Sequence, residues 1–68
     1  MQQPKYPEVI VPLDVGDGNI FAIVGRARGE LRRNGVPATE IDALCNQVSS
    51  ATSYDDAIRI VCEWVTAY

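Results

Sequence analysis

Glycines and acidic residues cluster in residues 14–19, the first place in the chain where residue types and spacing could support chemistry. A glycine-rich turn that leads into a helix can bind phosphate, because the free N–H groups at a helix N-terminus attract anions. Here, however, a dinucleotide-binding fingerprint would need Gly where Phe21 stands, and a P-loop would need a Lys followed by Ser or Thr. Asp17 would also repel phosphate. We therefore interpret the turn as a cap for the following helix.

The same segment contains oxygen ligands that suit calcium, but their spacing is wrong. An EF-hand loop places its ligands at every second residue and ends with Glu at position 12. Asp14, Asp17 and Asn19 are separated by three and then two residues, and the twelfth residue counted from Asp14 is Gly25. We therefore expect no calcium loop here and no metal site elsewhere.

Nucleophilic and acid–base catalysis lack the residues that they need. Cys45 and Cys62 fall on apolar helical stripes, and the chain contains no His that could serve as a base. The neighbouring Asp55 and Asp56 stand at a predicted helix start, where carboxylates favour the helix dipole. The sequence therefore predicts a protein that is not an enzyme and uses no cofactor. Without a CxxC pair, the two thiols are expected to be reduced core residues of a cytoplasmic protein.

Length and composition predict a single domain over residues 1–68. Hydrophobic residues make up 47% of the chain, and nine carboxylates against six basic residues give a net charge of −3. An acidic chain is poorly suited to general nucleic-acid binding, which depends on neutralising phosphates. Four of the six cations nevertheless lie within one short segment, at Arg26, Arg28, Arg32 and Arg33. No apolar run approaches the ~20 residues needed to cross a membrane, and residues 1–7 do not resemble a secretory signal.

The predicted fold is mainly α, with an N-terminal β-strand followed by a compact three-helix bundle (β-α-α-α). Residues 1–7 contain two prolines and are expected to form a flexible arm. Residues 8–13 are predicted to form a strand with Val9, Val11 and Leu13 on one face, which Pro12 makes an edge strand or terminates. Because unpaired backbone groups need partners, this strand should lie across the bundle or pair with its copy in a second chain.

Three helices are predicted from apolar residues that recur at i, i+3, i+4 and i+7. They cover residues 19–34, 38–50 and 54–67. Their apolar stripes are Ile20, Ile23, Val24, Ala27 and Leu31; Ile41, Leu44, Cys45 and Val48; and Ala57, Ile58, Val61, Cys62 and Val65, widened by Ile60 and Trp64. Asp17 or Asn19 can cap the first helix, Asn34-Gly35 can end it, and Ser53 with Asp56 forms a capping-box variant for the third.

The first helix carries a strip of small residues opposite its apolar stripe. Ala22, Gly25 and Gly29 share this side, and the strip is flanked by Arg26, Arg32 and Arg33. Each Gly inside a helix costs ~1 kcal/mol relative to Ala, so two of them on a solvated face call for a reason. One interpretation is a contact face for a partner protein; the other is that an exposed helix surface simply tolerates Gly.

Several short motifs also support a resemblance. They are Asp17-Gly18-Asn19-x-Phe21-x-x-x-Gly25, Leu31-Arg32-x-x-Gly35-Val36, Glu40-Ile41-Asp42, Tyr54-Asp55 and Trp64-Val65. With these residues the chain resembles a group of short, uncharacterised proteins from bacteriophages, prophages and other bacterial mobile elements. Pro37 departs from the group, which tends to have a capping Ser there. The resemblance implies no known activity, but it favours an accessory protein that binds a bacterial or phage protein.

These observations together predict a small, non-enzymatic protein-binding module, for which inhibition or regulation of a bacterial protein is one role. The candidate contact residues are Ala22, Gly25, Arg26, Gly29, Arg32 and Arg33. The alternative is a nucleic-acid-binding protein that uses the arginines of the first helix, and the net charge weighs against it. We also expect a homodimer, joined through the strand or through the small-residue strip, because so small a chain has little core to spare.

Overall fold

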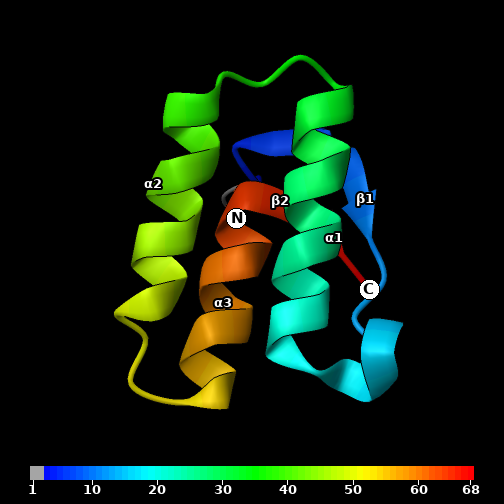
Figure 1. The fold of residues 1–68 in the computed structure, drawn as a ribbon. Helices are drawn as coiled ribbons and strands as arrows, with labels where there is room; N and C mark the ends of the chain where they lie inside the picture. Colours follow the sequence, from blue (N-terminus) through cyan, green and yellow to red (C-terminus); the bar gives the residue numbers. More distant parts are fainter. Residues whose placement is uncertain (1–2) are drawn as a thin grey trace.

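The fold combines three helices with a two-stranded parallel sheet (Figure 1). The computed structural model describes residues 3–68, so residues 1 and 2 of the predicted arm lie outside the described residues. The elements follow in the order β1 (Tyr6–Val11), the short 3-10 helix η1 (Val15–Gly18), α1 (Ile20–Arg33), α2 (Ala38–Ser49), α3 (Tyr54–Trp64) and β2 (Val65–Ala67). The predicted class, mainly α with a strand before three helices, is confirmed.

The C-terminal end of the predicted third helix is a strand instead. Helix α3 ends at Trp64, and β2 pairs in parallel with β1. The pairing continues beyond β2, where the Tyr68 N–H donates to the Val11 carbonyl at 3.1 Å. The prediction of helix through residue 67 is therefore wrong. Because β1 finds its hydrogen-bonding partner within the same chain, it needs no second chain to satisfy that edge.

The position of β1 also differs from the predicted 8–13, and two prolines explain how. Tyr6 lies opposite Val65 and Ile10 lies opposite Thr66, so the ladder is irregular between Tyr6 and Ile10. Pro7 falls in this interval and has no N–H to donate to a ladder. Its carbonyl is satisfied by the Thr66 hydroxyl, which donates to it at 2.7 Å. The strand then ends directly before Pro12, as a terminating proline would require.

Both ends of α1 have the caps that its sequence predicts. The Asn19 side chain accepts a hydrogen bond from the Phe21 N–H at 2.8 Å, so Asn19 rather than Asp17 is the N-cap. At the other end Gly35 adopts φ 81°. The Gly35 N–H donates to the Arg32 carbonyl and the Val36 N–H to the Leu31 carbonyl, which is the Schellman arrangement. These caps fix where α1 begins and ends.

The capping box predicted for α3 is present in a shifted form. The Ser53 hydroxyl accepts from the Asp56 N–H at 3.0 Å. The Asp56 carboxylate reaches back one residue further than in a standard box and accepts from the Thr52 N–H at 3.1 Å. The cap therefore orders the connection from α2 as well as the first turn of α3.

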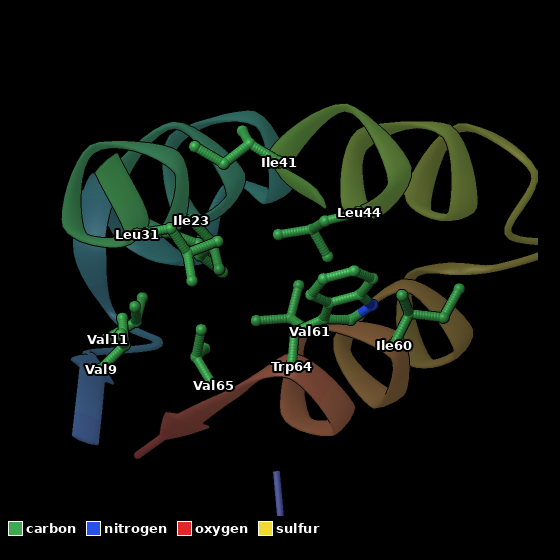
Figure 2. Close-up of a cluster of buried hydrophobic side chains, with 11 residues drawn as sticks. Val9, Val11, Ile23, Leu31, Ile41, Leu44, Ile60, Val61, Trp64 and Val65 are labelled. Atoms are coloured by element: carbon green, nitrogen blue, oxygen red, sulfur yellow. The ribbon is translucent and has the colours of Figure 1, made fainter. Parts of the chain in front are cut away.

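The hydrophobic core lies between the helices and the inner face of the sheet. Figure 2 shows its side chains converging from all three helices and both strands. Leu44 and Val61, at the centre of their predicted stripes, are fully buried, and so are Val9 and Val11 on the predicted inner face of β1. Trp64 is 5% exposed, and its indole N–H donates to the Gln47 side chain at 3.0 Å. The predicted core is therefore largely confirmed.

The buried face of α3 is rotated from the predicted one, and this corrects the expectation for the cysteines. Ala57, Ile60, Val61 and Trp64 are the buried residues of α3. Cys62 is exposed and Cys45 only partly buried, and both are free thiols. The prediction that both are core residues is therefore wrong. Ending the helix at Trp64 removes Val65 from the helical stripe, so the stripe centres on Ile60 and Trp64.

Lys5 and Tyr6, just before and at the start of β1, are held in place by side-chain contacts rather than belonging to a flexible arm. The Tyr6 ring stacks on the Trp64 ring with centroids 6.2 Å apart, and the Lys5 ammonium lies 4.6 Å from the Trp64 ring. Both residues also reach Glu40: Lys5 forms an ion pair with its carboxylate, and the Tyr6 hydroxyl donates to it at 3.1 Å. The prediction of flexibility is therefore wrong for Lys5 and Tyr6.

Candidate functional site: an apolar groove beside helix α1

The small-residue strip of α1 lies on the surface, but its three members differ. A Cβ at Gly16 would lie 2.4 Å from the Ala22 Cβ, so the preceding turn covers Ala22 closely. The close packing of this turn therefore explains why a small residue stands at position 22. A Cβ at Gly25 or Gly29 would meet nothing within 4 Å. No contact within residues 3–68 therefore explains these two glycines.

The arginines beside the strip differ in their ion pairs. The Arg26 Nε and the Arg33 Nη1 lie 3.7 Å and 3.5 Å from the same Glu30 Oε1, so this carboxylate partly offsets both charges. Arg32 is exposed and has no ion pair among the described residues. The structure does not gather the six predicted contact residues into one hollow. They remain a convex helix surface.

A groove opens instead along the neighbouring side of α1. It has a volume of about 700 Å³ and is formed by α1 from Ile20 to Arg28, the end of α2 and the start of α3. These three segments lie together at the lower end of the molecule in Figure 1. Most of the lining is apolar, and Val24 and Val48 come from facing helices. The remaining lining residues are Ile20, Phe21, Arg28, Cys45, Ser49, Ala51, Thr52, Ser53, Tyr54 and Ala57.

Phe21 is the most unusual side chain of the groove. It is the only Phe of the chain, and 85% of it is exposed. Burying an aromatic side chain of this size stabilises a fold by ~1.5–3 kcal/mol, which the native fold forgoes here. Ile10 and Tyr68 are also exposed, but neither lines this groove. Phe21 therefore combines an exposed aromatic surface with an adjoining apolar recess.

Tyr54 lines the groove and joins it to the turn before α1. Its hydroxyl donates to the Gly18 carbonyl at 2.5 Å, across 36 positions of the chain. Gly18 itself has φ 80°, in the region that favours Gly. The glycine-rich turn before α1 thus makes two structural contacts: Asn19 caps α1, and the Gly18 carbonyl accepts the hydrogen bond of Tyr54. The Asn19 hydrogen bond supports the interpretation of the turn as a cap.

Among residues 3–68, Arg28 is the only charged residue that lines the groove. It lies seven residues after Phe21, and therefore about two turns along the same side of α1. Arg28 is exposed and forms no ion pair within the part of the chain that the structure describes. The groove is consequently apolar near Phe21 and carries an unneutralised cation further along α1.

The other charged cluster is already neutralised within the chain. A shallower hollow of about 510 Å³ lies between α2 and α3, and its charged residues are Asp56, Arg59 and Glu63. The Arg59 guanidinium contacts the Asp56 carboxylate at 2.7 Å and the Glu63 carboxylate at 2.9 Å. The hydrogen bonds from Arg59 and from the Thr52 N–H hold the pKa of Asp56 below its usual value. These charges pair with one another, so the only cation of this hollow, Arg59, is already neutralised within the described residues.

Two further properties of the described residues bear on ligands. No group of three or more His, Cys, Asp or Glu side chains within residues 3–68 is placed to hold a metal ion. Over the same residues, every helix is too short or too polar to cross a membrane.

Sequence reasoning missed the groove, although one signal pointed to it. Phe21 lies about 100° around α1 from Ile20, and therefore beside the apolar stripe rather than within it. A large aromatic outside the stripe marks a surface that the helix does not bury in its own core. Tyr54 and Cys45 could not be assigned to this surface from the sequence, because only the packing of α2 and α3 brings them beside α1.

Comparison of the chain with protein-family models, with curated proteins and with solved structures found no match.

Proposed function

We propose that this protein is a small, non-enzymatic module that binds another protein through the groove beside α1. The observation that carries the proposal is Phe21, which is 85% exposed at the edge of an apolar recess. Exposed aromatic side chains beside apolar pockets are typical anchors of protein interfaces. The groove volume of about 700 Å³ is enough for several apolar side chains of a partner.

The motif quoted for the sequence resemblance supports the same surface. Asp17 and Gly18 have positive φ and form the turn, and Asn19 caps α1. Phe21 and Gly25 have no such role within the described chain, yet they lie one turn apart on α1. A partner could pack on the Phe21 ring and approach α1 closely over Gly25. On the resemblance, the proposal extends to a cytoplasmic accessory protein of a phage or mobile element that inhibits or regulates a bacterial protein.

Comparative capture from a bacterial lysate, with and without nuclease, tests the proposal. The baits are the wild type, Phe21→Ser and Tyr68→Ser, which removes another exposed aromatic outside the groove. A protein held by the wild type and by Tyr68→Ser, lost by Phe21→Ser and resistant to nuclease is the expected result. Retention by Phe21→Ser would contradict the groove. Loss on nuclease treatment would favour the nucleic-acid alternative through the arginines of α1.

Pairing with β2 satisfies one edge of β1, so the strip of α1 is the route to the predicted homodimer that we test first. Gly25 and Gly29 are open and would permit close helix–helix approach. Sedimentation equilibrium of the wild type and Gly25→Leu measures this. A dimer through the strip should dissociate in the variant, whereas a mass of 7.5 kDa for the wild type at all micromolar concentrations would exclude the homodimer.

A further inference from the structure

We infer that the partner segment bound by the groove is an amphipathic helix with acidic residues on one flank of its apolar face. This inference rests on the proposed function and specifies its ligand. It follows from two features of the described residues. The groove has an apolar part at Phe21, Val24 and Val48, and an unneutralised cation at Arg28.

The shape and composition of the groove favour a helix as the occupant. The groove runs beside α1 over at least the distance from Phe21 to Arg28, which is about two helical turns. An amphipathic helix presents apolar residues at i, i+3, i+4 and i+7, so one apolar face covers this distance. An added strand would need an open sheet edge, and no residue of β1 or β2 lines the groove. A second helix would also continue the packing of α1 against α2 and α3.

Charge complementarity then specifies the flank of that helix. Arg28 lies on the groove and the exposed Arg32 lies one turn further along α1, and neither has an ion pair within residues 3–68. Within the described part of the chain, no carboxylate lines the groove to offset them. A bound helix with Glu or Asp about two turns from its main apolar anchor would place carboxylates beside Arg28 while its anchor packs on Phe21. A basic helix would meet repulsion at the same place.

A displayed library of amphipathic helices tests the inference directly. The library keeps an apolar stripe at i, i+3, i+4 and i+7 and randomises both flanks, in helices of about 16 residues that are long enough to fold on binding. Helices that bind are selected from it separately with three immobilised proteins: the wild type, Arg28→Glu and Arg33→Glu. Arg33 is a control for position, because it is an exposed arginine of α1 that lies outside the groove and is paired with Glu30. All three proteins should retain their fold, since the changed side chains are exposed.

Enrichment of Asp and Glu on one flank is the expected result with the wild type and with Arg33→Glu, and enrichment of Lys and Arg with Arg28→Glu. In a synthetic copy of a selected helix, replacing the acidic residues by Lys should weaken binding to the wild type by about fivefold or more. That difference should become smaller with Arg28→Gln.

The two cysteines report where the helix binds. Cys45 lines the groove, whereas the exposed Cys62 lies outside it. The selected helix should slow alkylation of Cys45 and leave that of Cys62 unchanged. Protection of Cys45 at high protein concentration without any added helix would instead identify a second copy of this chain as the occupant and overturn the inference.

The remaining outcomes separate the inference from the proposed function. Selected helices that protect Cys45 but show no charge preference, or the same preference with Arg28→Glu, would overturn the acidic partner and leave groove binding intact. If no helix is selected while Phe21→Ser still abolishes capture of a protein, the helical form of the ligand is wrong and the proposed function stands. If neither experiment depends on Phe21 or Arg28, both proposals fail.

Discussion

Similar side chains lie near the two ends of the α2–α3 pair, but they are covered at one end and exposed at the other. At one end, Trp64 is covered by the beginning of β1 and the residue before it, with the Tyr6 ring and the Lys5 ammonium packed on its indole. At the other end, Phe21 and Tyr54 border a groove, and Arg28 stands beside it without an ion pair among the described residues. An aromatic surface and a nearby cation are therefore present at both ends. Within residues 3–68 only the first end is covered.

This difference separates residues that stabilise the fold from residues that are available for binding. A covered aromatic contributes its burial to the folding free energy. An exposed aromatic contributes little, so its effect should appear in binding instead. Substitutions at the two ends should consequently affect different measurements, which provides a direct way to test the comparison.

The largest effect is expected at the covered end. Trp64→Ala removes a side chain that is only 5% exposed, together with its hydrogen bond to Gln47. It should lower the free energy of unfolding by ~3–5 kcal/mol in urea titrations. A loss below ~1 kcal/mol would show that Trp64 is not held in the core as described, and the comparison between the two ends would fail.

A core residue between the two ends provides a reference for that value. Leu44 is fully buried, and Leu44→Ala should cost ~2–5 kcal/mol in the same titrations. Because Leu44 does not line the groove, the variant should still bind a helix selected for the groove at temperatures where it remains folded. Binding lost from a folded Leu44→Ala protein would contradict this separation.

The covered end should also respond to pH. The hydrogen bonds that Lys5 and Tyr6 donate hold the pKa of Glu40 below its ordinary value of 4.5. A lowered folded-state pKa stabilises the protein above the unfolded pKa, and that stabilisation is lost as the pH falls through the folded value. The melting temperature should therefore fall as the pH falls below about 4.5. Glu40→Gln should reduce this dependence and leave the part that comes from Asp56, whose pKa is also lowered.

The same cluster predicts a change at high pH. Hydrogen bonding to Glu40 raises the pKa of Lys5 above 10.5, and burial together with the Glu40 carboxylate raises the pKa of Tyr6 above 10.0. Groups with raised folded-state pKa values stabilise the protein below their unfolded values, and this stabilisation is lost as the pH rises. The melting temperature should therefore fall above about pH 10, and less so in Glu40→Gln. An unchanged profile in that variant would contradict the cluster.

The smallest effects on stability are expected on the binding side. Phe21→Ser should change the free energy of unfolding by less than ~0.5 kcal/mol, because the ring is largely exposed. Gly25→Ala should stabilise the protein by up to ~1 kcal/mol, since nothing lies within 4 Å of the added Cβ. Urea titration measures both. A destabilising Gly25→Ala would show that the chain itself needs this glycine.

Local chemistry along the sequence determined most of the helical framework. Asn19, Gly35 and Ser53 act at helix ends because their side chains or backbone freedom satisfy groups that a helix leaves unpaired. The apolar stripes likewise placed Ile23, Leu31 and Leu44 in the core, since a helix repeats every 3.6 residues and must bury one face. These properties depend on residues only a few positions apart.

Tertiary structure alone decided the two features that matter most for function. Residues 65–67 leave the helical pattern because β1, nearly the whole chain away, offers them backbone partners that no local pattern contains. The groove likewise exists only where α1, α2 and α3 meet, so Phe21, Cys45 and Tyr54 become neighbours through packing. The sequence did show that Phe21 lies outside the apolar stripe of α1. It could not show what stands beside that ring, because the facing side chains belong to helices whose relative positions are set by the common core.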